Sequence, residues 1–177
     1  MNIQELLSRI EAQECDFSEI TLHKATLNGT NLSRINFTKA DLSCADLSNC
    51  DMSGACLAQA NLSDAELKGT NLVGANLVDV NLIGAELIEA DLKAADLSRG
   101  DLRCANFHNA NLSGANLTNA NLSGADLSGA NLTNAKLDGV DLSGADLTGV
   151  DLSSTKSMKQ EGMVSGVSPN WISWGSH

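Results

Sequence analysis

Aromatic residues are nearly absent from this sequence. Its 177 residues include no tyrosine, three phenylalanines and two tryptophans, which excludes a core built on large aromatic side chains. Basic residues are also few, and the net charge of −11 argues against direct binding of nucleic-acid phosphates. The sequence has neither an apolar run long enough to span a membrane nor a recognisable targeting signal near Met1. We therefore expect a cytoplasmic protein that binds neither nucleic acid nor a membrane directly.

Proline is almost absent as well. The single proline is Pro169, so every earlier residue keeps a backbone N–H that can donate to a neighbouring segment. Most positions are occupied by Leu, Ala, Asn, Asp, Ser or Gly. A bias of this strength indicates an internal repeat.

A five-residue period runs through most of the chain. From Phe17 to Leu152 every fifth residue is Leu, Phe or Met, which gives 28 repeats over residues 15–154 without a slip in register. A small or branched residue, usually Ala, stands two positions earlier, and the residue between is mostly Asn or Asp. This period suits neither an α-helix nor an extended strand. It predicts a chain that turns a corner every five residues, with the Leu and the small residue pointing inward.

The remaining positions of the repeat suit corners that face water. Short Asn and Asp side chains can satisfy backbone groups at turns, and Gly occupies the last position of eleven repeats, where tight corners are expected. One coil cannot bury its Leu residues alone. Coils stacked at ~4.8 Å would bury them in ladders and pair the backbone along the axis.

The pattern Ala-(Asn/Asp)-Leu-x-x, as in residues 115–119 and 125–129, resembles the pentapeptide repeat family and covers about four-fifths of the chain. The resemblance implies an all-β fold, a right-handed quadrilateral β-helix with four pentapeptides per coil. About seven coils at ~4.8 Å each would then form a rod roughly 34 Å long. The unbroken register is similar to that of the cyanobacterial members, and it implies no protruding loops, unlike quinolone-resistance members whose loops are functional.

Three segments are expected along the chain. Residues 1–14 should hold a short N-terminal capping helix, residues 15–154 the β-helix, and residues 155–177 a C-terminal cap or flexible tail. The apolar residues of the helix fall on one face: Ile3, Leu6, Leu7 and Ile10. In the last segment Trp171 and Trp174 either fold back over the last coil or join a symmetric dimer contact, unless the segment is simply disordered.

The charges are spread unevenly if four repeats make one coil, because residues twenty positions apart then share a side. One side carries a net charge of −5, with a single lysine, Lys68, against six carboxylates: Asp46, Glu66, Glu86, Glu89, Asp126 and Asp146. The other three sides carry −1 or −2 each. We call the first of these the acidic side, and its carboxylates are candidate contacts for a partner.

An apolar belt is the second surface feature. Val73, Val78, Ile83 and Ile88 occupy the water-facing position after the core Leu in four successive repeats, where Ser or Thr is usual. Four successive repeats go once around the rod, so the belt presents no single docking patch. The β-branched side chains suit strand geometry, although Val78, Ile83 and Ile88 are also candidate contacts for a partner.

The cysteines and histidines predict no chemistry. Cys15 and Cys50 lie at inward positions and are expected in the core, whereas Cys44 and Cys104 share a corner column three coils apart, roughly 14 Å and beyond disulfide reach. There is no CxxC motif, so reduced thiols are expected. A catalytic Cys/His pair would need a pocket and an orienting group, and a stacked Leu rod offers no evident cleft. We predict no catalytic, cofactor-binding or metal site.

Two functions remain in view. The first is a non-enzymatic protein-interaction or scaffold module, with an unknown protein partner, that is either a monomer or a tail-mediated homodimer. The alternative is a DNA mimic that binds DNA gyrase, as the resemblance to quinolone-resistance members implies. The acidic balance and the length favour mimicry. B-DNA, however, carries one charge per ~1.7 Å, so a rod of roughly 34 Å would need about twenty.

Overall fold

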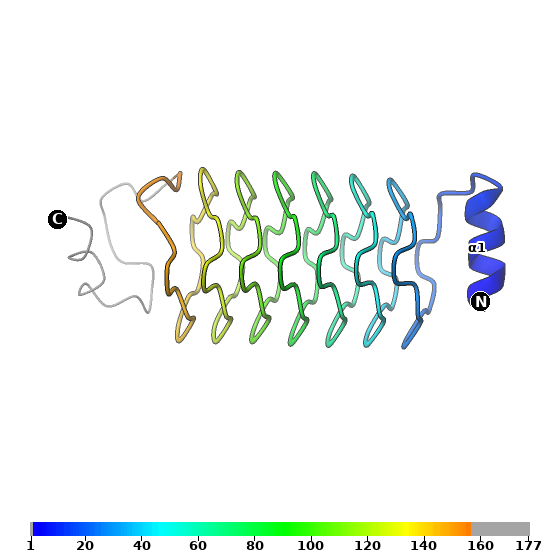
Figure 1. Ribbon diagram of the computed structural model, residues 1–177, viewed down its shortest axis with the longest axis horizontal. Coiled ribbons are helices and arrows are strands. Elements are labelled where there is room, and N and C mark those ends of the chain that lie inside the picture. Colours follow the sequence, from blue (N-terminus) through cyan, green and yellow to red (C-terminus); the bar gives the residue numbers. More distant parts are fainter. Residues whose placement is uncertain (1, 157–177) are drawn as a thin grey trace.

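The protein is a straight rod of stacked coils with one helix at its N-terminal end (Figure 1). The computed structural model describes residues 2–156. Parallel β-bridges connect the residues that precede core residues to the residues twenty positions later, from Asp16–Asn36 to Lys136–Lys156, with Asn131 as the exception. This spacing confirms that four repeats make one coil.

The coils pair through single residues rather than through continuous strands. Within residues 2–156 every β-bridge is isolated. The cause is the last position of each repeat, where φ lies between 55° and 76° from Glu19 to Gly149. This left-handed residue turns the chain before an extended segment can lengthen. The expected all-β fold is therefore realised as parallel one-residue bridges on each side of the coil.

All five backbone N–H groups of a standard repeat have acceptors. In residues 40–44, three N–H groups donate to carbonyls of the neighbouring coils, at 2.8–2.9 Å, and the N–H of Ala40 closes the corner turn onto Phe37 O at 2.9 Å. The fifth N–H, that of Ser43, donates to the Asp41 Oδ1 at 3.1 Å. The same side-chain bond forms in all 22 repeats that have Asn or Asp before the core residue. The preference for Asn and Asp follows from this need for an acceptor.

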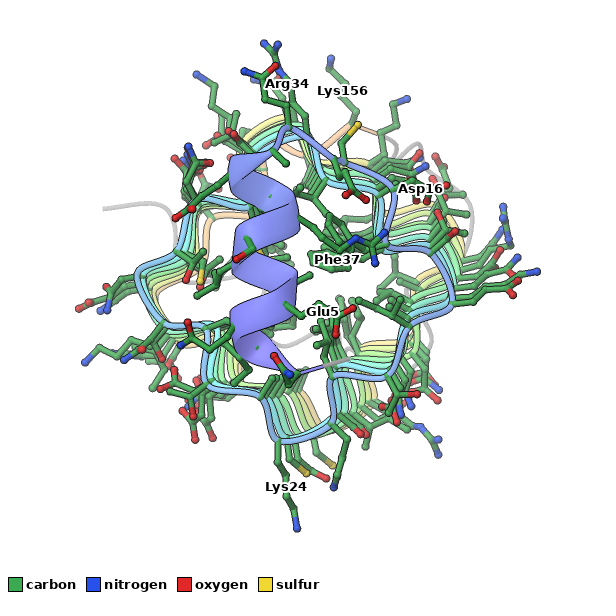
Figure 2. All side chains as sticks on the ribbon, turned by 90° about the vertical axis from the view of Figure 1, so that its right-hand side faces the viewer. Glu5, Asp16, Lys24, Arg34, Phe37 and Lys156 are labelled. Atoms are coloured by element: carbon green, nitrogen blue, oxygen red, sulfur yellow. The ribbon has the colours of Figure 1, made fainter. Side chains whose placement is uncertain are left out.

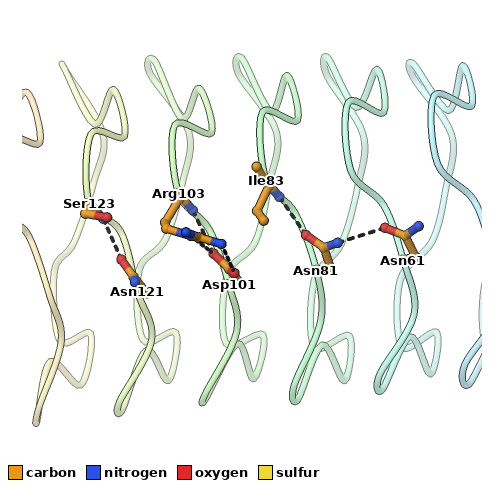
Figure 3. A network of polar contacts seen from close by, with 7 residues as sticks. All are labelled: Asn61, Asn81, Ile83, Asp101, Arg103, Asn121 and Ser123. Atoms are coloured by element: carbon orange, nitrogen blue, oxygen red, sulfur yellow. Dashed lines mark hydrogen bonds and ion pairs between the residues drawn. The ribbon is translucent and has the colours of Figure 1, made fainter.

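Asparagine also bridges successive coils. The Oδ1 of Asn81 accepts from the N–H of Ile83 at 3.1 Å, while its Nδ2 donates to the Oδ1 of Asn61 at 3.0 Å (Figure 3). An ionised aspartate accepts but cannot donate. An Asn side chain can therefore accept from the N–H of its own corner and donate to the preceding coil. An Asp side chain accepts from the N–H of its own corner and can accept from the coil that follows, as Asp41 does from Asn61.

The core is a set of apolar columns inside the coils. The core residues from Phe17 to Leu142 are at most 5% exposed, and the small residues beside them are mostly buried Ala. Two buried polar groups at small-residue positions are satisfied by the backbone: the Cys50 thiol donates to Leu27 O at 3.0 Å and the Thr70 hydroxyl to Leu47 O at 2.8 Å. Burial raises the pKa of the Cys50 thiol.

The expectation that Cys15 belongs to the core is wrong. Its side chain is exposed, whereas Cys50 is buried as expected. The reason is position: Cys15 stands at the start of the first coil, so no preceding coil covers it. It borders a shallow hollow of about 300 Å³ beside Ile10 and Glu14, at the end of the helix.

The helix α1 (Ile3–Glu11) lies across the N-terminal end of the stack (Figure 2). Asn2 caps it, since its side chain accepts from the N–H of Glu5 at 2.8 Å. Leu6 is fully buried, and the Arg9 guanidinium lies 5.0 Å from the centre of the Phe17 ring. The apolar face of α1 therefore covers the first coil. No helix among residues 2–156 is long and apolar enough to cross a bilayer.

Replacement of Ala94 by Gly should stabilise the protein. Ala94 is exposed and has a φ of 57°. The left-handed conformation costs a residue with a Cβ about 1–2 kcal/mol, whereas Gly adds about 0.4–1 kcal/mol of unfolded-state entropy. The free energy of unfolding in urea should rise by about 0.5–1 kcal/mol. Ala58→Gly, at a position whose φ is not positive, is the control and should lower it; a loss of stability in both variants would refute the strain argument.

Candidate functional site

The predicted acidic side is a continuous column in the structure. The β-bridges join Asp46 to Glu66, Glu66 to Glu86, and Asp126 to Asp146, so these carboxylates sit in successive coils. Asn106 occupies the position between Glu86 and Asp126 and interrupts the charge. Glu66 and Asp146 are exposed, as is Glu89 in the adjoining corner, while Asp46, Glu86 and Asp126 are half-buried.

Six repeats depart from the structural rule of Asn or Asp before the core residue, and two of them carry glutamates of the acidic side. Glu66 and Glu86 stand where 22 other repeats have Asn or Asp, and neither accepts from the N–H two residues later. Within residues 2–156 the N–H groups of Lys68 and Ile88 thus have no side-chain acceptor of this kind. The longer Glu86 side chain instead accepts from Asn106 Nδ2 at 2.9 Å in the next coil. The acidic side therefore gives up two corner hydrogen bonds, each worth about 1 kcal/mol elsewhere.

The ion pairs among residues 2–156 lie off the acidic side. They are Arg9–Glu14 beside α1, Lys39–Glu19 and Arg99–Asp79 on the opposite side, and Arg103–Asp101 on the side before it. Like charges 4 Å apart repel by about 1 kcal/mol in water. Without an ion pair on this side, that repulsion is not relieved within residues 2–156, and the column keeps its negative field.

Hydroxyl groups hold several aspartates in the charged form. The Thr148 hydroxyl donates to Asp146 at 2.6 Å, and together with the backbone N–H of Thr148 it lowers the pKa of this carboxyl. The pKa values of four more aspartates are lowered by a Ser hydroxyl and N–H two residues later: Asp16, Asp41, Asp141 and Asp151.

These shifts predict loss of stability in acid. A carboxyl with a folded pKa below its unfolded value of about 3.9 stabilises the fold above that pH, and this contribution disappears as pH falls through the folded pKa. The free energy of unfolding should therefore drop below about pH 4. Asp41→Asn keeps the corner acceptor without the charge, so its decline should be shallower. Asn121→Ser, which removes no carboxylate, is the control and should keep the original slope in urea titrations across pH 3–7; an unchanged slope in Asp41→Asn would contradict the prediction.

The apolar belt is half-buried. Val73, Val78, Ile83 and Ile88 each follow a core residue at a corner, one on each side of the rod, and none is fully exposed. Figure 3 shows Ile83 beside the chain of polar contacts on its side. The remaining candidates, Trp171 and Trp174, lie outside the residues that the structure describes.

Two Asp–Ser–His chains link neighbouring coils, and the sequence reasoning missed both. The Ser43 hydroxyl donates to Asp41 at 2.6 Å and lies 2.8 Å from His23 Nδ1. His108 lies at the same distance from the hydroxyl of Ser128, which donates to Asp126. The signal was available, because His and Ser are twenty positions apart in both cases.

The order of groups in these chains differs from that of a catalytic triad. There the histidine stands between the serine and the carboxylate and removes the serine proton. In this protein the serine stands in the middle and its hydroxyl donates a hydrogen bond to the carboxylate, so the histidine Nδ1–H is the donor to the serine oxygen. The geometry orients an imidazole on the surface and activates no nucleophile. Among residues 2–156 no group of three or more His, Cys, Asp or Glu side chains is arranged to hold a metal ion.

Comparison with known proteins identifies the repeat. The profile of the pentapeptide repeats matches eight copies, in residues 15–54, 60–99, 90–129 and 125–156. A search of curated proteins gave no match. Among solved structures, HetL of the cyanobacterium Nostoc sp. strain PCC 7120, described as involved in regulation of heterocyst differentiation, is 30% identical over 88% of this chain and 94% of its own, with a TM-score of 0.49.

Two further structures share the repeat. The protein alr5209 of Nostoc PCC 7120 is 32% identical over 54% of this chain and 80% of its own, with a TM-score of 0.46. QnrB1, a plasmid-mediated fluoroquinolone resistance protein, is 20% identical over 78% and 90%, with a TM-score of 0.28. The matched residues include most of the stacked coils, which are therefore built from pentapeptide repeats. The chain belongs to the pentapeptide repeat family.

Proposed function

We propose that this protein is a non-enzymatic interaction module of the cytoplasm, whose acidic side binds a basic surface of a protein partner. The observation that carries the proposal is the stack of Asp46, Glu66 and Glu86 in successive coils without an ion pair among residues 2–156. A rigid rod holds these charges at fixed spacing, so a partner meets them without an ordering cost. Complementary charge would also speed the encounter and fix its orientation.

Two features of the column support a role outside the fold. Glu66 and Glu86 give up the corner hydrogen bond that Asn or Asp makes in 22 repeats, so the needs of the solenoid do not explain them. Glu86 gains a bond from Asn106 in exchange, but Glu66 accepts no side-chain hydrogen bond within residues 2–156, and a residue that breaks a local rule without a local gain is expected at a functional position. Two of the other three sides neutralise part of their charge, with the Arg99–Asp79 and Arg103–Asp101 pairs.

The test is charge reversal with a matched control. Glu66→Lys combined with Glu86→Lys should weaken capture of the partner from extracts of the source organism by roughly tenfold or more, because two contacts of about 1 kcal/mol each become repulsive. Asp64→Lys combined with Asp138→Lys changes the net charge equally at exposed positions off the acidic side and should leave capture unchanged. Equal capture by both double variants, or equal loss in both, would exclude the acidic side as the binding surface.

DNA mimicry directed at gyrase is the competing function. The carboxylate column favours it, but Asn106 breaks the run between Glu86 and Asp126, and the charge falls well short of the roughly twenty that B-DNA would show over this length. A supercoiling assay with and without a fluoroquinolone separates the two functions. The interaction module should have no effect up to tens of micromolar. Inhibition of supercoiling, or protection from drug-induced cleavage, would replace our proposal with mimicry.

A further inference from the structure

The C-terminal end of the rod leaves part of the core uncovered. Four apolar side chains of the last coil are only partly buried: Ala145, Leu147, Val150 and Leu152. Their counterparts one coil earlier are at most 4% exposed: Ala125, Leu127, Ala130 and Leu132. Both sets occupy the same positions of the repeat. The last coil is more exposed because no further coil covers it within residues 2–156.

The backbone is also unpaired at this end. One coil earlier the N–H of Leu122 donates to Asp141 O and that of Leu127 to Asp146 O, both at 2.8 Å. Within residues 2–156 no carbonyl accepts from the N–H of Leu142 or Leu147. An edge with free donors beside exposed apolar side chains is a template for another segment of chain. At the opposite end α1 covers the apolar side chains of the first coil with the buried Leu6, although the N–H groups of Thr21 and Thr26 likewise have no carbonyl acceptor within residues 2–156.

We propose that residues 157–177 of this same chain cover the open end, with Trp171 and Trp174 packed against the partly exposed side chains of the last coil. The segment starts from Lys156, which lies on the last coil at that end of the rod (Figure 1). Its 21 residues would reach about 70 Å if extended, far more than is needed to cross one coil.

The sequence of this segment suits a cover and not an eighth coil. The positions that would continue the five-residue period hold Ser157, Gly162, Val167 and Ile172, so no column of Leu could form. Both tryptophans of the protein stand within it. Tryptophan buries a large apolar area, and its indole N–H can donate to a carbonyl such as that of Ala145, which accepts from no backbone N–H within residues 2–156.

Intrinsic fluorescence of the full chain tests the proposal directly. The protein has no tyrosine and its two tryptophans are Trp171 and Trp174, so tryptophan emission reports on this segment alone. In native buffer we expect emission shifted to the blue and several-fold weaker quenching by acrylamide than for the chain unfolded in urea. Sedimentation should give the mass of a monomer, 18.5 kDa.

Substitutions locate the contact. Leu147→Asp and Leu152→Asp place charges on the open end and should shift the emission to the red and increase quenching. Ile3→Asp, at a partly buried position of α1 on the other end, is the matched control and should leave the emission unchanged. Circular dichroism and thermal melting check that each variant folds, and if neither Leu variant does, the quenching and mass of the unsubstituted chain still decide.

Three outcomes would overturn the proposal. Emission and quenching equal to those of the unfolded chain would show that the tryptophans stay in water. Shielded tryptophans in a dimer, with shielding lost on dilution, would show that a second copy supplies the cover. Shielded tryptophans whose emission and quenching are unchanged by Leu147→Asp and Leu152→Asp would show that the segment packs elsewhere on the rod.

Discussion

Phe107→Ala is expected to lower the free energy of unfolding by about 3–5 kcal/mol. Phe107 is fully buried in a column that otherwise holds Leu, between Leu87 and Leu127. Removing the ring leaves a cavity in the middle of the rod, and the coils cannot close it because backbone hydrogen bonds fix their spacing. Each coil contacts only its neighbours, so the cavity weakens the interfaces on both of its sides.

Phe107→Leu removes the aromatic ring but leaves a smaller cavity than Phe107→Ala, so it shows how much of the loss of stability is due to the cavity. Leu is the usual residue at this position of the repeat, so the cost should stay below about 1.5 kcal/mol. Urea unfolding followed by circular dichroism measures both variants. Equal losses in the free energy of unfolding for Phe107→Ala and Phe107→Leu would contradict the prediction, because they would mean that the neighbouring coils close the cavity.

The largest effect at a small-residue position is expected for Gly100→Val, a loss of about 1–3 kcal/mol. Gly100 occupies the inward position where most repeats have Ala, and its φ is not positive, so no backbone conformation requires Gly there. A Cβ on Gly100 would lie 3.1 Å from Leu97 O, 3.2 Å from Leu102 Cδ2 and 3.3 Å from Cγ1 of Val80, the larger residue at the same position one coil earlier. The glycine compensates for the larger valine.

A double-mutant cycle tests this compensation. Val80→Gly alone should also destabilise, because it leaves a cavity. The exchange Val80→Gly with Gly100→Val restores the summed volume, so it should recover about 0.5–3 kcal/mol relative to the sum of the single changes. Thermal and urea unfolding of the four proteins give the coupling. If the loss in the free energy of unfolding of the double variant equals the sum of the single losses, the side chains at positions 80 and 100 do not compete for the same volume.

The architecture was predictable because its signal is a strict period. Register, coil length and the buried columns follow from Leu, Phe or Met at every fifth residue and from the family resemblance. The error at Cys15 shows the limit of that reasoning, since a repeat position is inward everywhere but is covered only where a coil precedes it. The left-handed conformation of residues such as Lys24 and Arg34 was equally hidden, because the repeat imposes φ near 58° on side chains that do not favour it.

The surface was less predictable than the core. The columns of the acidic side follow from a spacing of twenty, but the departure of Glu66 and Glu86 becomes visible only once the corner hydrogen bonds of Asn and Asp are known. The belt residues Ile83 and Ile88 looked water-facing in the repeat, yet the corners half-bury them. A sequence gives the direction of a side chain more readily than the depth to which its neighbours cover it.

The spacing of twenty residues between paired positions also bears on how the rod assembles. Each residue of a coil pairs with the residue twenty positions earlier, so during synthesis the preceding coil is already available for pairing when the next coil leaves the ribosome. We expect growth of the stack to need no search among distant segments, because each coil contacts only its neighbours. We expect a fault in one coil to halt everything synthesised after it, while the coils laid down before it stay folded, so that damage spreads in one direction only.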